Sequence, residues 1–462
     1  MSDYRIEVDS LGEVQVPSDA YYGAQTQRAK NNFPISDLRF TRPFIHALGT
    51  IKLAAAVTNE SLGLLDAEIA RAIVDSAEEV IAGKHDQEFV LDVFQTGSGT
   101  STNMNANEVI AHLATERLGG KTVHPNDHVN MCQSSNDVIP TAMHVAARAE
   151  IEHTLLPSLA KFVSSLQSKA EEFDGIVKSG RTHLMDATPI RLGQEFGGYA
   201  AQIGKASKRI ELASKELAEL ALGGTAVGTG INRPPAFPSK AIDIIADRIG
   251  VSFNETSNHV EAQAAKDAYV FTAGALNSLA VALMKIANDI RHLSSGPTSG
   301  IYEISLPAIQ PGSSIMPGKV NPVMSEALMM VCAKVMGNHL TITTCGQHGN
   351  YELNVMMPVM THAMLESIQI LSTACDAFRA NCLDGIRANA DRCKELLELN
   401  PSIATALNTR IGYDKASKIA KKAAKDKSSV RDAAIELGYL TEKELDDFLD
   451  VKSMTEPGIP GE

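Results

Sequence analysis

The chain has 462 residues, 44% of them hydrophobic, and a formal net charge of −13. This length and composition allow a large core and more than one domain. The acidic balance excludes nonspecific binding of nucleic acid through a basic surface, and no apolar run approaches the length of a bilayer span, so we expect no membrane partner.

The N-terminal part, residues 1–140, contains short elements and two segments rich in small polar residues. Met1–Leu11 carries three acidic residues and no apolar stretch, so we expect no secretory signal and a cytoplasmic location. The polar segments are TGSGTSTNMNANEV (96–109) and HPNDHVNMCQSSND (124–137). We place helix starts after Asn103 and after Pro140, where unpaired backbone amides favour anion binding.

The central part, residues 141–391, is dominated by helical periodicity. The apolar spacing predicts helices over 141–173, 191–222, 259–295 and 356–390, and Pro157 interrupts or kinks the first. Small side chains, mainly Ala, cover their faces and allow close approach. Helices this long need partners on more than one side, which predicts a bundle that packs against copies of itself.

Two further polar segments lie in this part, SGRTHLMDATP (179–189) and GSSIMPGKVNP (312–322). The second is not a nucleotide phosphate loop, because five residues separate Gly312 from Gly318 and a valine follows Lys319. Asn321 suits a helix N-cap and Pro322 the first helical position, so a helix is expected from here to Gly337.

The C-terminal part, residues 392–462, has the pattern of a small domain of short helices. One helix begins at Thr441, where Glu444 completes a capping box. A stripe of lysines predicts a solvated helix face: Lys415, Lys418, Lys421, Lys422 and Lys425. The six cysteines of the chain include no Cys-x-x-Cys pair, which indicates buried reduced thiols rather than a metal site.

The four polar segments predict a site for a small dicarboxylate. They supply few cations, Lys319 and His183, but many neutral donors: Ser98, Thr100, Ser134, Ser135, Asn136, Thr182 and Asn321. Directed hydrogen bonds of this kind suit a carboxylate better than a polyphosphate held by charge.

The loop GSSIMPGKVNP resembles the signature of the fumarase/aspartase superfamily. The segments TGSGTSTNMN, HPNDHVN, QSSND, GRTHLMDATP and GGTAVGTG are similar to other blocks of the class II fumarate hydratases. The similarity runs from VPSDAYYGAQTQRA to TALNTRIGYDKASKIAKKA, nearly the whole chain. It implies a mainly α fold with a long central helical bundle, a tetramer core of about 20 helices, and smaller N- and C-terminal domains.

The resemblance implies a lyase of the tricarboxylic acid cycle that reversibly hydrates fumarate to (S)-malate, with no metal and no organic cofactor. By motif position Ser313 is the base that takes a proton beside a carboxylate, and the product is an aci-carboxylate intermediate. Lys319 and Asn321 hold the carboxylate that gains charge. His183 handles the water, and Glu326 orients and charges that histidine.

The same resemblance assigns substrate positioning to Ser98, Thr100, Ser134, Ser135, Asn136, Thr182, Lys319 and Asn321. His124, Asn126 and Asp127 match a second anion-binding segment, which is either an entry or regulatory site or only a helix-edge network. Because the family builds each active site from three chains, a homotetramer is implied.

Two alternatives remain open. Aspartate ammonia-lyase shares the fold and the loop, and the segments VPSDAYYG and NDHVN are closer to its sequence. His183, the stretch Thr96–Ser98 and Gly318 instead follow the fumarase pattern, and they touch the part of the ligand that differs. The other alternative is a non-catalytic scaffold, against which the intact Ser313, Lys319 and His183 argue.

Overall fold

The computed structural model describes residues 4–460, so the first three residues of the segment expected to lack a secretory signal fall outside it. Helices make up 62% of the structure, which confirms the mainly α prediction. The contacts divide the chain into two compact units. The first is Met1–Pro157, Ala206–Ala280 and Val331–Thr373, and the second is Ser158–Lys205, Val281–Met330 and Ala374–Glu462. The predicted division at residues 140 and 391 stays a prediction.

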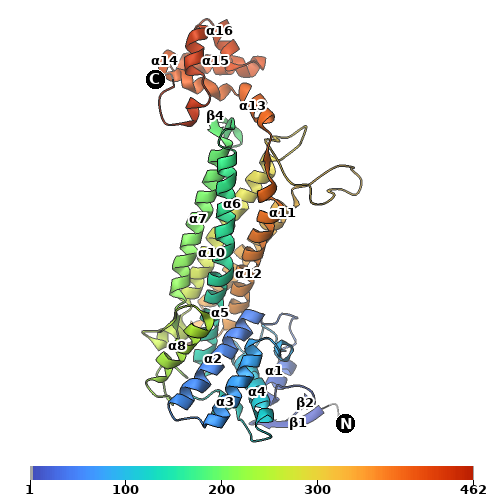
Figure 1. The fold of residues 1–462 in the computed structure, drawn as a ribbon, viewed down its shortest axis with the longest axis vertical. Coiled ribbons are helices and arrows are strands. Elements are labelled where there is room, and N and C mark those ends of the chain that lie inside the picture. The colour runs from blue at the N-terminus through green and yellow to red at the C-terminus, as the bar shows by residue number, and fades with distance from the viewer. Residues whose placement is uncertain (1–3, 461–462) are drawn as a thin grey trace. The chain divides into compact units, whose positions relative to one another are not determined.

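The first unit is built around α2 (Arg42–Ser61), which contacts α3, α5 and α8 and buries Phe44, Leu48 and Ile51 (Figure 1). Its other helices are α1 (Ala24–Asn32), α3 (Ala67–Ile81), α4 (Thr100–Arg117), α5 (Ser135–Glu150), α8 (Phe237–Ile249) and α9 (His259–Ala264). Its strands pair two by two: antiparallel β1 (Tyr4–Asp9) and β2 (Gly12–Pro17), parallel β5 (Glu219–Leu220) and β6 (Asn254–Glu255), and antiparallel β8 (Gly349–Asn350) and β9 (Leu353–Asn354).

Glu108 of α4 caps the start of α1. The N-cap residue Gly23 has no side chain to do so, and the Glu108 carboxylate accepts hydrogen bonds of 2.9–3.1 Å from the backbone amides of Gly23, Gln25 and Thr26. Burial raises the pKa of Glu108, and these hydrogen bonds oppose that rise. A negative charge at a helix N-terminus is favourable, so this contact fixes α1 against the helix that follows the first polar segment.

The second unit contains two strand pairs and a cluster of short C-terminal helices. The pairs are β3 (Val177–Thr182) with β4 (Met185–Arg191), and β7 (Ile304–Ser305) with β10 (Arg387–Ala388). The helices are α13 (Ala390–Glu398), α14 (Asn408–Ile411), α15 (Tyr413–Asp426), α16 (Val430–Glu436) and α17 (Glu442–Phe448). The capping box at Thr441 and the solvated lysine face of α15 are confirmed, with Ala416 and Ile419 buried on the opposite face.

The long helices are α6 (Leu156–Glu172), α7 (Leu192–Glu216), α10 (Asp267–Leu293), α11 (Val323–Gly346) and α12 (Met357–Asn381). A π-helical turn over Ile151–Leu155 separates α5 from α6, so the interruption expected at Pro157 is a bulge just before the proline. α10 is apolar and long enough to cross a membrane by length and composition, contrary to our expectation. The apolar window of α10 is 56% buried in the structure, as in a core helix.

Three predicted helix starts were wrong. α4 begins at Thr100, so Asn103 lies inside it, and α5 begins at Ser135, because Ser134 and Asp137 form a capping box. α11 begins at Val323, and the side chain of Asn321 is bonded inside the loop instead of capping the helix.

Several helix ends also differ from the prediction: α7 ends at Glu216 instead of 222, and α12 ends at Asn381 instead of 390. α11 continues past Gly337 to Gly346, because burial of Ile342 and Cys345 outweighs a glycine cost of about 1 kcal/mol. The stretch expected as one helix from 259 breaks before Asp267. There the buried Lys266 Nζ donates to the carbonyls of residues 262, 263 and 265 and ends α9.

Candidate functional site

The loop that carries Ser313 is closed at its base by backbone and side-chain hydrogen bonds. The Gly312 amide donates to the Lys319 carbonyl at 2.7 Å, and Asn321 Nδ2 donates to the Gly312 carbonyl at 2.6 Å. A Cβ at position 312 would lie 2.5 Å from the Lys319 carbonyl oxygen, so only glycine fits this crossing. The segment from Leu306 to Pro322 contains neither helix nor strand and extends as a long loop before α11 (Figure 1).

Ser313 Oγ accepts hydrogen bonds from two backbone amides within this loop. The amide of Ile315 lies at 3.3 Å and that of Met316 at 3.0 Å. Amides that point at a hydroxyl oxygen favour negative charge on it. The loop therefore supplies part of what a serine needs to act as a base.

Lys319 and Asn321 are joined and face a cavity of about 470 Å³. Lys319 Nζ donates to Asn321 Oδ1 at 2.7 Å. Arg291 and Lys319 are the cationic groups among the residues that line this cavity, together with the hydroxyl-bearing side chains of Ser294, Ser295, Tyr302 and Ser305. A dicarboxylate matches this combination of two cations and neutral donors.

His183 occupies the tip of a two-residue hairpin, which the sequence did not predict. Thr182 pairs with Met185, and His183 and Leu184 both have positive φ, 56° and 62°. Such a turn normally uses Asn-Gly, and non-glycine residues there carry backbone strain. Thr182 and His183 are exposed, as expected for groups that meet a ligand or a partner chain.

The base of this hairpin is held by buried ion pairs. Arg181 binds Glu303 through two hydrogen bonds of 2.8 and 2.9 Å, and Lys178 lies 3.2 Å from the same carboxylate. Glu303 is fully buried, so the pairing fixes the strand that presents Thr182 and His183. His183 itself forms no hydrogen bond or ion pair with Glu326 anywhere in residues 4–460.

In the first unit, the structure brings two of the predicted polar segments together. Ser98 Oγ and Thr100 Oγ1 are 2.8 Å apart at the start of α4, and Ser134, Ser135 and Asn136 form the start of α5. Asn103 of α4 donates to Ser135 Oγ at 3.1 Å and so joins the two helix starts. Five predicted donors thus lie at neighbouring helix N-termini, a favourable place for an anion.

The segment GGTAVGTG supports the second of these helix starts. Buried Asp137 accepts hydrogen bonds from the amides of Gly223 and Thr225 at 3.0 and 2.9 Å. Asn136 Nδ2 donates to the Ala226 carbonyl at 2.8 Å. Burial raises the pKa of Asp137, while these backbone donors and Lys52 stabilise its charged form. Asn136 and Ser134 are therefore held in defined orientations.

Comparisons with known proteins identify the family of the chain. A family model described as a lyase matches residues 12–337, and one described as the fumarase C C-terminus matches residues 403–456. The class II fumarate hydratase of Methylorubrum extorquens is 52% identical over 98% of this chain and 97% of its own length. The mitochondrial fumarate hydratase of Saccharomyces cerevisiae is 51% identical over 99% of this chain and 95% of its own.

The chain belongs to the class II fumarate hydratase family. Solved structures agree: the class II fumarase of Schistosoma mansoni superposes with a TM-score of 0.96 at 39% identity, covering 98% of this chain and 99% of its own. A fumarate lyase of Brucella melitensis, related to delta crystallin and solved with cobalt bound, gives 0.94 at 44% identity, covering 98% and 100%. The fold is therefore that of the fumarase/aspartase superfamily, as predicted.

The second anion segment expected in this fumarase forms a π-helical turn, Pro125–Val129. His124 is exposed, and its Nδ1 accepts the amides of Asn126 and Asp127 at 3.3 and 3.1 Å and lies 3.3 Å from the Asp127 carboxylate. The adjacent cavity of about 560 Å³ is also lined by the carboxylates of Glu7, Asp9, Glu108 and Glu116. The negative charges of these carboxylates oppose an anion in the cavity, so the prediction of a second anion site rests on the exposed His124 ring alone.

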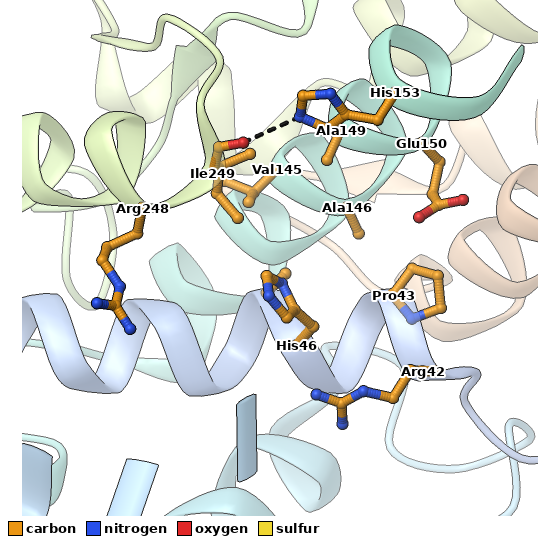
Figure 2. Close-up of a pocket in the computed structure, with 11 residues that line it drawn as sticks. Arg42, Pro43, His46, Val145, Ala146, Ala149, Glu150, His153, Arg248 and Ile249 are labelled. Atoms are coloured by element: carbon orange, nitrogen blue, oxygen red, sulfur yellow. Dashed lines mark hydrogen bonds between the residues drawn. The ribbon is translucent and has the colours of Figure 1, made fainter. Parts of the chain in front are cut away.

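Another cavity, of about 350 Å³, is lined by none of the predicted site residues (Figure 2). His46 of α2 and His153 of the π-turn point into it. Its two arginines are already paired, Arg42 with Asp86 and Arg248 with Glu78, and His153 Nε2 donates to the Ile249 carbonyl at 2.9 Å. Burial and the nearby arginines lower the pKa of His46, which keeps the ring neutral at pH 7. This cavity has no free cation for a dicarboxylate.

Sequence reasoning missed Lys52 and the role of Asn103. Lys52 is fully buried and bonds Asn103, Asn130 and Gln133. A signal was present, because Lys52 interrupts the apolar run of α2 between Ile51 and Leu53, and an unpaired lysine is almost never buried.

Proposed function

We propose that this protein is a fumarate hydratase, which reversibly adds water to fumarate and gives (S)-malate in the tricarboxylic acid cycle. The observation that carries the proposal is identity of about half the residues to class II fumarate hydratases over the whole chain. The intact loop with Ser313, Lys319 and Asn321 supports the same chemistry.

In the direction of dehydration, Ser313 Oγ in its deprotonated form takes the proton from C3 of malate and becomes a neutral hydroxyl. The C3–H bond breaks, and its electron pair moves onto the neighbouring carboxylate as an aci-carboxylate. That pair then forms the C2–C3 double bond as the C2–O bond breaks. The oxygen leaves as water with a proton supplied by His183, directly or through a bound water.

The amides of Ile315 and Met316 favour negative charge on Ser313 Oγ and so assist proton removal. Lys319 and Asn321 hold the carboxylate that gains charge. Donors preorganised for the developing charge are worth about 10²–10³ in rate each. Ser98, Thr100, Ser134, Ser135, Asn136 and Thr182 position the rest of the dicarboxylate.

The proposed enzyme is a cytoplasmic homotetramer in which each active site combines residues of three chains. Within residues 4–460 no carboxylate pairs with His183, which supports a partner chain as the source of Glu326. The exposed His124 ring is the proposed anion contact of the second segment, an entry or regulatory site, and Asn126 and Asp127 hold that ring through their backbone amides.

The test is an absorbance assay in the fumarate band, with malate and then aspartate as substrate. We expect fumarate from malate and none from aspartate, and the opposite result would replace hydration by ammonia elimination. Ser313→Ala should lower kcat by about 10²–10⁴-fold, because it removes the base. Ser314→Ala, an exposed neighbour, is the matched control and should keep full activity. Full activity of Ser313→Ala would exclude Ser313 as the base, and a wild-type protein that acts on neither malate nor aspartate would point to an inert scaffold.

A further inference from the structure

Lys52 lies at the centre of a buried network of amide side chains. Its Nζ donates to Asn103 Oδ1 at 2.8 Å, Asn130 Oδ1 at 3.0 Å and Gln133 Oε1 at 2.9 Å. Burial lowers the pKa of Lys52 to about 7, and the charge of Asp137 opposes that fall. The three oxygens around Nζ select the ammonium form, which has three hydrogens and no acceptor, so these three bonds use all of its donors. The mechanism above gives Lys52 no role.

The lysine dictates which way the amide of Asn103 points. Because an ammonium group only donates, the oxygen of Asn103 must face it, and Nδ2 must point away. On that side Nδ2 lies 3.1 Å from Ser135 Oγ and 3.2 Å from Asn130 Oδ1. Asn130 Oδ1 is itself turned toward Lys52 and also accepts from Asn107, so it cannot donate in return.

Ser135 Oγ is therefore an acceptor toward the protein. Within residues 4–460, Asn103 is its one hydrogen-bond partner. A hydroxyl that accepts an N–H keeps its own proton for another acceptor. A hydroxyl that donated inward would instead turn a lone pair toward an anionic ligand and repel it.

The nearby carboxylate does not compete for the lysine. Asp137 is buried and accepts from the amides of Ser134, Gly223 and Thr225. Its charge is stabilised by these backbone donors and by the nearby charge of Lys52, while the hydrogen bonds of Lys52 go to the neutral amides. The hydrogen bonds of Asp137 and those of Lys52 therefore involve different groups around the start of α5.

We propose that Lys52 and Asn103 are positioning residues that set the hydrogen-bond direction at Ser135, so that its proton is donated to a carboxylate of the bound substrate. The proposal rests on the proposed function, in which Ser135 contacts the dicarboxylate. It adds the buried cation of Lys52, acting through Asn103 and Ser135, to the groups that make the site specific for anions.

Asn103→Asp reverses the hydrogen bond at nearly constant shape. The new carboxylate accepts where Nδ2 donated, so Ser135 turns its proton inward, and Lys52 pairs with the added charge. We expect KM for malate to rise about 10- to 100-fold, the cost of a hydrogen bond to a charged group, with a smaller change in kcat. Ser135→Ala should raise KM by a similar factor.

The double variant N103D/S135A decides between positioning and general damage. If Asn103 acts through Ser135, the KM of the double variant stays within about 2-fold of the KM of S135A. Additive effects would overturn the proposal, because charge repulsion or a structural defect acts without the hydroxyl. Wild-type protein that forms no fumarate from malate would instead overturn the proposed function.

Two substitutions of the lysine give an independent arm. Lys52→Met removes the donor that orients Asn103 and should raise KM, whereas Lys52→Arg, which also only donates, should restore most of the affinity. Thermal unfolding of each variant identifies a protein that has not folded. Equal KM for folded K52M and wild type would contradict the proposal. If K52M does not fold, the proposal is tested by N103D alone.

Discussion

Donors around a hydroxyl decide its role in this protein. Ser313 receives two backbone amides, which favour charge on its oxygen. Ser135 receives one side-chain amide, which leaves its proton available. These different contacts fit the proposed roles of the two serines, Ser313 as a base and Ser135 as a substrate donor.

The proposed site residues could be named from the sequence because they lie in short contiguous motifs. Ser313, Lys319 and Asn321 fall within nine residues of each other. Lys52 could not be assigned a role in this way, since its partners are 51 to 81 residues away and meet it only after α2, α4 and the π-turn have packed.

His144 predicts an acid sensitivity of stability. Burial lowers its pKa from 6.5 to about 4. Between these values the unfolded chain binds a proton that the folded chain does not, so stability falls as the pH falls through this window. Because the ring is only half-buried in the chain, we expect a loss of roughly 1–2 kcal/mol between pH 7 and pH 5.

Denaturant unfolding at the two pH values, at one protein concentration, measures this loss. His144→Asn keeps a donor for the Glu219 carbonyl, which His144 Nδ1 contacts at 2.9 Å, but has no titrating group. The variant should lose about 1–2 kcal/mol less than wild type over the same interval. The same acid loss in both proteins would rule out His144 as the cause.

At the scale of elements, the sequence located the helices but not their ends. The long helices are found where periodicity placed them, because a buried apolar face is a local pattern. Their ends depend on contacts that the pattern does not contain. Lys266 ends α9 with its side chain, and Ser134 with Asp137 starts α5 six residues early.

The hairpin of β3 and β4 was missed for a similar reason. A two-residue hairpin is normally read from Asn-Gly or Asp-Gly, and here the turn residues are His183 and Leu184. The buried Arg181–Glu303 pair holds this turn in place, and its partner lies 122 residues away.

Gly97 fixes the first polar segment against the start of α12. An added Cβ would lie 1.7 Å from the Val355 carbonyl oxygen, and the Gly97 carbonyl accepts the Met357 amide at 3.0 Å. Gly97→Ala must move the segment that carries Ser98 and Thr100. We expect a loss of about 1–3 kcal/mol in stability together with a rise in KM for malate.

Gly175→Ala is the matched control, because no atom lies within 4 Å of the added Cβ and its φ is not left-handed. It should change stability by less than about 0.5–1 kcal/mol and leave KM unchanged. Thermal unfolding and a substrate titration on both variants measure these effects. Wild-type behaviour of G97A would show that the segment tolerates displacement.

At the scale of the molecule, the long helices expose large apolar side chains in the single chain. Phe271 and Val281 of α10 are 55% and 52% exposed, and Met330 and Leu340 of α11 are 69% and 67% exposed. Apolar surface of this kind on several helices is typical of an association interface. It supports the proposed homotetramer, in which copies of the same helices cover one another.

Met330→Glu tests whether activity requires that assembly. A carboxylate in an apolar interface loses its hydration without gaining a partner, so the variant should dissociate while its helices remain folded. If each active site needs three chains, the dissociated subunits should have no measurable activity, because no single chain provides all the groups. Tyr413→Glu, at a 75% exposed position of α15, is the matched control and should remain assembled and active. On the same samples, sedimentation measures assembly, circular dichroism measures helix content, and the rate with malate measures activity. A folded monomer with full activity would contradict the shared site and place every catalytic group in one chain.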